Sequence, residues 1–371
     1  MVTPALPIIE KSFLLKPGEV EWIVSTFLIG YVLGQLIYGP LANRYGRLKS
    51  LKFGLNINLL GLCICIFAAI YGHFFWLLIG RFITGLGSAA GLTCTLILIN
   101  EWLPEVKRKA AMAYSVLSFA LGVGFAVLIG GLITQYIHWN GCFVFLFLQG
   151  LVLRIGVCVF DETLQTPMYF NIHKLLNDYR QAMSSLQLMV FSAVWGTCSA
   201  MGYCFAAAGP QIAHSYLQLS AAEYGYWNML NLLGMVLGGL SARILLQNLP
   251  TIYVIRCGYT GCLLALLSLS MMLIIKHYST LWFFASSCTL YWFSAYLFAG
   301  GSYVASAAIK DKASASSMMS FVNMGIATLG VIIMPCLSSD PFYGFVILVS
   351  SCMLITLGLS ILCRTINMGA P

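Results

Sequence analysis

The sequence predicts an all-α polytopic membrane protein, and two observations support this fold class. Of the 371 residues, 60% are hydrophobic and only 8% are charged, whereas soluble domains carry about 25% charged residues. Continuous apolar runs, each of about the 20 residues that a transmembrane helix needs, recur along the whole chain. A transmembrane β-barrel would instead show short segments of alternating hydrophobicity, so we expect helices.

Eleven membrane spans are expected, and most of the loops between them are short. The longest loop is polar and mixed in charge, and it separates five spans from six. We therefore expect an N-terminal bundle over 1–160, a cytoplasmic central loop over 161–183 and a C-terminal bundle over 184–371. The expected spans are 20–42, 50–71, 74–99, 110–134, 140–160, 184–208, 224–246, 252–275, 280–304, 314–336 and 342–363.

The basic residues gather on one side of the membrane in this arrangement. Short basic stretches occupy 44–52, 107–109 and 310–312, whereas the opposite side holds only Lys11, Lys16 and Lys276. Cytoplasmic loops of membrane proteins carry the excess of Lys and Arg. The central loop and the C-terminus are therefore predicted to be cytoplasmic, and residues 1–19 extracytoplasmic.

Composition also argues against several other classes of protein. The net charge of +8 comes from these loops and indicates topology rather than nucleic-acid binding. The 13 cysteines lie mostly in apolar segments and form no CxxC pair, which is typical of small buried side chains. No nucleophile–base pair, metal cluster or phosphate-binding loop is recognisable, so we expect neither an enzyme nor a bound cofactor or metal.

Two short matches indicate that the chain contains an internal repeat. GPLANR at 39–44 resembles GGLSAR at 238–243, and KAAMAYSVLSF at 109–119 resembles DKASASSMMSF at 311–321, at nearly the same offset. Both copies lie in spans of the same orientation, and transporters with parallel halves hold their substrate between them near the midplane. By this symmetry one further span is expected before residue 20.

The stretch GPLANRYGRLKS resembles the signature loop of the major facilitator superfamily. The matching residues are Gly39, Arg44, Gly46 and Arg47, while Asn43 stands where the family usually has an acid. The resemblance implies a gate in which Glu101, at the cytoplasmic end of the third expected span, pairs with an arginine of the loop. The alternative is that these arginines determine topology only.

Further stretches resemble other motifs of the same superfamily. IGRFITGLGSAAG at 79–91 resembles its fourth-helix motif, and DETL at 161–164 closes the first half as in many members. AVLIGG at 126–131 resembles the fifth-helix antiporter motif, with Val127 in place of its proline. The stretch 206–231, and PALP near the start, resemble the bicyclomycin and chloramphenicol resistance (Bcr/CflA) branch of drug:proton antiporters.

The resemblance implies twelve helices in two six-helix bundles in a bacterial inner membrane. It implies alternating access, export of a small amphiphilic solute (a drug, metabolite or siderophore) and a proton gradient as the energy source, with a monomer expected. Relatives carry an acid in helix 1 just before the PALP match, a position that would fall immediately before Met1. Met1–Pro7 is therefore expected to be the outer end of helix 1.

Arg81 is the most informative single residue, because it lies about 10 Å inside its span at 1.5 Å per residue. A cation at that depth usually faces a cavity or a partner, so Arg81 and Thr84 are expected to line the central cavity and take part in coupling. Snorkelling of Arg81 to the outer interface is the alternative. No acid lies in the middle of an expected span, so the chain offers no clear proton carrier.

The solute lining is expected from the family's cavity-facing helices, and aromatic side chains with sparse amides suit flat, partly apolar solutes. Ordinary helix packing is the alternative for each position. The glycines of the fifth-helix motif (Gly122, Gly130 and Gly131) are expected at close helix contacts. The expected lining residues are Tyr31, Gln35, Phe119, Trp195, Tyr203, Asn228, Asn231, Tyr291, Tyr296 and Asn323.

The leading functional hypothesis is a secondary transporter that exports a small amphiphile. Two other hypotheses stay open. One is an importer or uncoupled facilitator, which the missing mid-span acid and Val127 favour. The other is a degenerate, non-transporting chain that acts as a membrane receptor or assembly partner.

Overall fold

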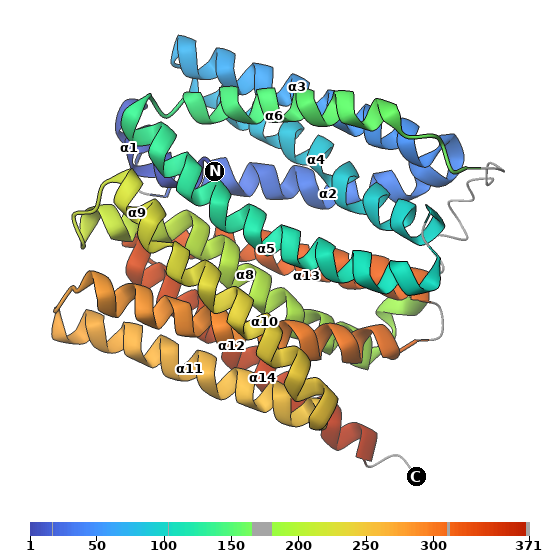
Figure 1. The fold of residues 1–371 in the computed structure, drawn as a ribbon. Coiled ribbons are helices and arrows are strands. Elements are labelled where there is room, and N and C mark those ends of the chain that lie inside the picture. Colours follow the sequence, from blue (N-terminus) through green and yellow to red (C-terminus); the bar gives the residue numbers. More distant parts are fainter. Residues whose placement is uncertain (17, 103, 165–179, 310–311, 369–371) are drawn as a thin grey trace.

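The computed structural model describes residues 1–16, 18–102, 104–164, 180–309 and 312–368, and these fold into helices joined by short connections (Figure 1). Two short helices, η1 (Thr3–Ala5) and α1 (Leu6–Ser12), open the chain. The remaining helices are α2 (Trp22–Tyr45), α3 (Arg47–Tyr71), α4 (Phe74–Trp102), α5 (Glu105–Tyr136), α6 (Gly141–Gly156), η2 (Val157–Val159), α8 (Leu186–Ser215), α9 (Ala221–Trp227), α10 (Met229–Asn248), α11 (Thr251–Ile275), α12 (Thr280–Ala307), α13 (Lys312–Leu337) and α14 (Pro341–Met368).

Every expected span coincides with a helix or a pair of helices, which confirms the all-α polytopic class. In the described part of the chain, nine of these helical segments are long and apolar enough to cross a membrane. The 28-residue α12 is not among them, because its sequence is rich in serine and tyrosine. The apolar segment described for α5 covers only Leu121–Tyr136. The span expected at 224–246 is broken at Asn228 into α9 and α10.

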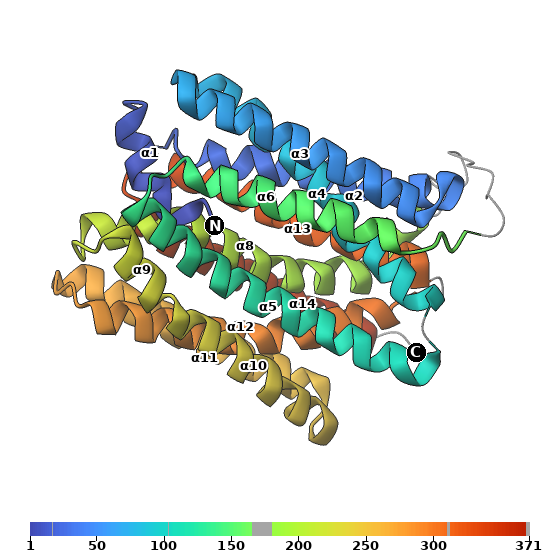
Figure 2. The ribbon, with the colours of Figure 1, turned by 45° about the horizontal axis from the view of Figure 1, so that its top comes forward.

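The helices form two groups that lie side by side (Figures 1 and 2). In the first half, α4 packs between α2 and α3, and α6 packs on α3. In the second half, α8 packs on α12, α13 and α14, while α12 also contacts α10 and α11. The halves meet where α2 contacts α13 and where α5 contacts α9 and α10.

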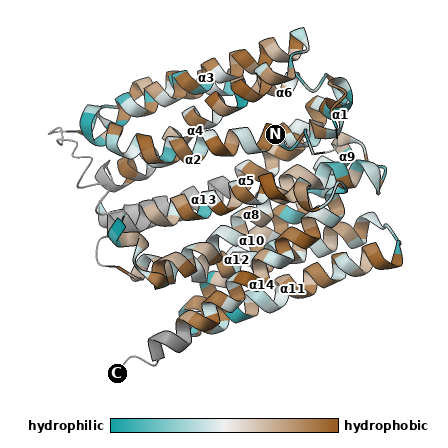
Figure 3. Ribbon diagram, turned by 180° about the vertical axis from the view of Figure 1, so that it is seen from behind, coloured by the Kyte–Doolittle hydropathy of each residue, from teal (hydrophilic) through white to brown (hydrophobic). Residues whose placement is uncertain are grey.

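The two ends of the molecule differ in the segments that they carry. We call the end with α1 and α9 the α1 end, and the opposite end, where the segment after η2 leaves the first half, the central-loop end (Figure 1). Hydrophilic residues concentrate at these two ends, whereas the middle of most helices is hydrophobic (Figure 3). Large apolar side chains are exposed on the outer faces of the helices, among them Ile70, Leu264 and Ile355, as expected for contact with lipid.

The N-terminal segment is buried in the fold at the α1 end. Val2, Ala5, Leu6 and Ile9 are each at most 5% exposed, and η1 contacts α5, α8 and α9. This segment therefore touches both halves of the molecule.

Two of the three glycines expected at close contacts in α5 lie at such contacts. A side chain at Gly130 would collide with the backbone of Met1, and one at Gly131 would collide with the backbone of Ala221 at the start of α9. Gly122 differs, because no described atom of another segment lies within 4 Å of the place where its Cβ would be. Both of these backbone contacts of α5 lie toward the α1 end.

Candidate functional site

The turn between α2 and α3 carries the signature loop at the central-loop end. Gly46 has a φ of 116°, a conformation that side chains other than glycine rarely adopt. The Arg47 guanidinium donates from Nη1 to the Ala42 carbonyl oxygen at 2.8 Å, and the Arg44 guanidinium lies 5.2 Å from the centre of the Tyr45 ring. The side chain of Glu101, the expected partner of these arginines, lies outside the described part of the structure.

Glu162 holds the start of α3 in place, a role that we did not expect for it. Its carboxylate accepts the backbone N–H groups of Arg47 at 2.7 Å, Leu48 at 3.1 Å and Lys49 at 3.2 Å. These N–H groups have no partner within the helix, and the helix dipole favours a negative charge there. The acid of the DETL stretch therefore caps the helix that follows the signature loop.

The hydrogen bonds also set the charge state of Glu162. Burial alone would raise the pKa of this carboxyl, but the N–H groups of Arg47, Lys49, Leu164 and Thr163 outweigh burial and hold the pKa below its ordinary range. Ionised Glu162 therefore stabilises the folded chain above the ordinary carboxyl pKa, and that contribution is lost as the pH falls through the lowered pKa.

We expect Glu162→Gln to lower the thermal midpoint of unfolding in detergent at neutral pH. The deficit should disappear as the pH falls through the lowered pKa, because the wild-type carboxylate is then protonated as well. Asp161→Asn removes the same charge one residue away and is the matched control. Equal midpoints for wild type and Glu162→Gln at neutral pH would contradict the capping role.

Arg81 lies on α4 and faces a cavity of about 450 Å³. Its Nε donates to the Ile23 carbonyl oxygen at 3.1 Å, and its guanidinium lies 4.4 Å from the centre of the Phe27 ring. Arg81 thus binds the backbone of α2 and packs on one of its aromatic rings. The described lining residues all come from residues 1–153, so this cavity belongs to the first half and not to the interface between the halves.

The polar groups around Arg81 are amides and hydroxyls. Asn58 of α3 donates to the Thr84 carbonyl oxygen at 3.2 Å and to the Ser88 hydroxyl at 2.7 Å. The Thr84 hydroxyl donates to the Gly80 carbonyl oxygen of its own helix. Gln149 of α6 also lines the cavity, and no described lining residue is acidic.

Three buried polar atoms on three helices are a second set of candidate ligand-binding groups. They are Gln35 Oε1 on α2, Trp195 Nε1 on α8 and Asn323 Oδ1 on α13, and in the structure as described none has a hydrogen-bond partner. A buried polar atom without a partner costs roughly 1–3 kcal/mol. Such atoms are therefore candidates to bind a ligand.

Contacts at the α1 end indicate how far along its helix each of these atoms lies. The Glu21–Gln211 hydrogen bond joins the residue before α2 to α8, and a Cβ at Gly18 would lie 3.1 Å from Pro335 of α13. Counted from Glu21, Gln211 and Pro335, the three side chains lie about 18–24 Å along their helices, at 1.5 Å per residue. A Cβ at Gly196 would lie 3.3 Å from the Asn323 Cα, which places α8 and α13 together at this level.

Other expected lining residues lie close to aromatic side chains. Tyr203 of α8 is close enough to Tyr31 of α2 to interact electrostatically, and Tyr291 packs edge-on against Phe205 with ring centres 5.7 Å apart. The side chain of Phe119 lies outside the described part of the structure.

Three of the expected lining residues are hydrogen-bonded inside the second half. Asn231 donates to Asn228 at 3.0 Å and accepts from the Ser287 hydroxyl at 2.7 Å. The Tyr296 hydroxyl donates to the Ser241 hydroxyl at 3.0 Å, within the GGLSAR repeat. These residues thus join α10 to α12, and these hydrogen bonds engage their polar atoms within the second half.

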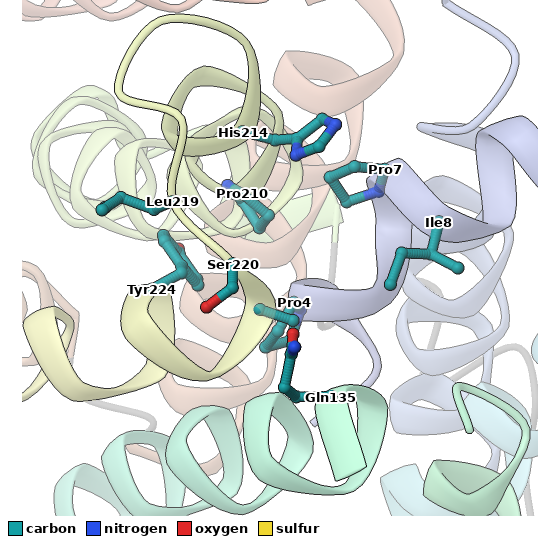
Figure 4. Close-up of a pocket in the computed structure, with 10 residues that line it drawn as sticks. Pro4, Pro7, Ile8, Gln135, Pro210, His214, Leu219, Ser220 and Tyr224 are labelled. Atoms are coloured by element: carbon teal, nitrogen blue, oxygen red, sulfur yellow. The ribbon is translucent and has the colours of Figure 1, made fainter. Parts of the chain in front are cut away.

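A third group of residues lies at the α1 end, between the halves. Gln211 donates to Glu21 Oε1 at 2.9 Å, and Lys11 Nζ lies 2.8 Å from His214 Nε2. Beside them, a pocket of about 240 Å³ opens among α1, α5, α8 and α9, with His214 next to Pro7 and with Pro4 near Gln135 (Figure 4). We did not expect a role for Gln211 or His214.

A family model described as "Major Facilitator Superfamily" matches residues 1–335. The "Bicyclomycin resistance protein homolog" of Haemophilus influenzae is 24% identical over 249 residues, which are 64% of this chain and 59% of that protein. The "Niacin transporter NiaP" of Acinetobacter baylyi is 33% identical over 134 residues, 36% of this chain and 30% of that protein. The chain thus spans less than two thirds of the length of the curated relatives that it matches.

Solved transporter structures have the same fold. A partially occluded inward-open conformation of the xylose transporter XylE from E. coli superimposes with a TM-score of 0.73, 12% identity, and coverage of 96% of this chain and 92% of that one. The POT family transporter PepTSo superimposes with a TM-score of 0.77 and 12% identity, over 99% of this chain and 95% of that one.

Proposed function

Because this chain belongs to the Major Facilitator Superfamily, we propose that it is a secondary transporter that exports a small amphiphilic solute by alternating access. The similarity to a bicyclomycin resistance protein homolog supports export, and it supports a drug, metabolite or siderophore as the solute. A proton gradient is the proposed energy source. We propose a monomer in a bacterial inner membrane, with the α1 end outside and the central loop in the cytoplasm.

The observation that carries this proposal is the set of unpartnered atoms on α2, α8 and α13. Gln35 and Asn323 offer acceptors and Trp195 offers a donor, and they come from both halves, between which a rocking carrier holds its solute. The three helices carry no charged residue over 22–43, 186–213 and 313–337. We therefore propose an uncharged solute with hydrogen-bonding groups on a partly apolar body.

Accumulation of radiolabelled neutral amphiphiles in cells tests export. Cells that express the chain should accumulate at least about threefold less of a transported compound than cells with an empty vector. Asn323→Ala should raise accumulation toward the empty-vector level, because loss of one hydrogen bond of about 1 kcal/mol weakens binding about fivefold. Asn248→Ala alters an exposed amide that bonds to its own helix and should behave as wild type. Equal accumulation with and without the chain, over a broad panel, would argue against export.

An importer or uncoupled facilitator is the second candidate function. Arg81 favours it, because the described lining of its cavity holds a cation and no acid, and proton coupling needs a titratable group. Purified protein in proteoliposomes separates the two functions. Solute flux that follows only the solute gradient, and is unchanged by an imposed pH gradient, would favour the facilitator.

A further inference from the structure

The last turns of α8 meet α1 and the start of α2 across the boundary between the two halves. Gln211 and His214 lie one turn apart on α8, and each contacts a titratable residue of the first half. Gln211 Nε2 donates to Glu21 Oε1 at 2.9 Å and to the Ala207 carbonyl oxygen at 3.0 Å. Lys11 Nζ lies 2.8 Å from His214 Nε2. Both contacts must break if the halves separate at this end.

Glu21 is held in an unusual environment for a carboxyl group. Its side chain is only 4% exposed, and its Oε2 is buried with no hydrogen-bond partner in the described structure. In the described structure the side-chain donor to this carboxyl is the uncharged amide of Gln211, and the Glu21 backbone N–H is a further neutral donor. A buried carboxylate with only neutral donors is destabilised relative to the same group in water, whereas the protonated acid is much less so.

The neighbouring charges add little that would stabilise an ionised Glu21. From α1, Glu10 repels it, and the pKa of Glu10 is itself raised by burial and by Glu21, against the opposing effect of Lys11. The last turn of α8 carries the titratable side chain of His214, whose Nε2 lies 2.8 Å from Lys11 Nζ. Glu19, next to the start of α2, accepts the Lys16 backbone N–H, and α13 presents the uncharged Pro335 here. Burial accordingly raises the pKa of Glu21 above its ordinary range, and the hydrogen bonds from Gln211 and from the Glu21 backbone N–H offset this only in part.

We propose that Glu21 and Gln211 form a proton-dependent latch that holds the α1 end shut. With Glu21 protonated, the carboxyl stays buried against Gln211 and the halves remain together. With Glu21 ionised, the charge is better solvated when α8 moves away and water reaches the carboxylate. The latch depends only on Glu21 and Gln211 and does not require that the chain transports a solute. Its role in a transport cycle rests on the proposed function. In that cycle, proton uptake from outside would close the outer end.

The direction of the pH dependence follows from linkage. The closed state has the raised pKa and so binds the proton more tightly than the open state, in which Glu21 is solvated. The stabilisation of the closed state is complete below the ordinary carboxyl pKa and is lost as the pH rises through the raised value. Each unit by which the pKa is raised is worth about tenfold in the closed-to-open ratio.

The Lys11–His214 contact also joins the two halves at this end. A test of Glu21 therefore needs a variant of His214 as a separate control.

Hydrogen–deuterium exchange of the full chain in lipid nanodiscs tests the latch without any transport assay. We expect peptides covering 1–24 and 205–216 to lose protection at least about tenfold as the pH rises from about 5 to about 8, after correction for the intrinsic exchange rate. Glu21→Gln carries an amide in place of the neutral acid and should stay protected throughout. Gln211→Ala removes the donor and should be less protected than wild type at acid pH.

Glu10→Gln and His214→Gln are the matched controls, and both should keep the wild-type direction of pH dependence. Protection that does not change with pH in the wild type would overturn the latch, as would protection that falls in acid. A pH response that survives in Glu21→Gln but disappears in His214→Gln would also overturn it. Because exchange is measured without solute, a pH-dependent latch in a chain that exports nothing would refute the proposed function and leave the latch standing.

Discussion

Replacing Arg81 by alanine is expected to reduce solute transport at least about tenfold, while the protein still folds and inserts. The guanidinium holds the Ile23 carbonyl oxygen of α2 and lies over the Phe27 ring, so it fixes α4 against α2 within the cavity. A hydrogen bond from a charged donor contributes about 1.5–3 kcal/mol, which corresponds to a tenfold or larger change in an equilibrium between carrier states.

Initial rates of transport in proteoliposomes, normalised to the amount of inserted protein, measure this effect. Arg81→Lys should recover only part of the rate, because an ammonium cannot reproduce the planar guanidinium over the ring. Arg154→Ala is the matched control, since Arg154 lies on α6 and bonds to Asn56 at an exposed position. A wild-type rate for Arg81→Ala would instead favour a chain whose first half does not take part in transport.

Replacing Gly85 by alanine is expected to have the largest effect on folding. A Cβ at this position would collide with the backbone of Phe27 on α2, and a backbone cannot move aside as a flexible side chain can. Overpacking of this kind costs about 1–3 kcal/mol, and the thermal midpoint in detergent and the yield of inserted protein should both fall.

Gly91→Ala is the control for Gly85→Ala, because Gly91 lies on the same helix and, among the described residues, no atom of another segment lies within 4 Å of its Cβ position. Its midpoint should match that of the wild type. If both variants unfolded at the same temperature as the wild type, the close approach of α2 and α4 would not matter for stability.

The spans could be predicted from the sequence because each depends on a local property, the apolar run that a helix needs to cross a membrane. The start of α3 after Gly46 and the end of α4 near Trp102 lie within a few residues of the expected limits. The position of Arg81 near the start of α4 followed in the same way. The family also followed from local motifs, and the match over residues 1–335 confirms it.

Contacts between distant segments could not be predicted in this way. Glu162 lies 115 residues from Arg47, and Gln211 lies 190 residues from Glu21, so no periodicity connects them. The asparagines expected to line the solute site show the same limit, because the sequence does not reveal which of them pair with each other. Asn228 and Asn231 were equal candidates with Asn323 on sequence grounds, but their three-residue spacing lets them bond to each other, whereas Asn323 Oδ1 has no partner in the described structure.

The placement of α1 and the α8–α9 connection on one surface has a practical consequence. Lys11 and Pro7 come from one half and His214 from the other, and together they line or border one pocket (Figure 4). An antibody fragment that recognises this composite epitope would bind only while the two halves are apposed there. Such a fragment would act as a conformational probe, trapping one state for imaging and inhibiting turnover without touching the solute.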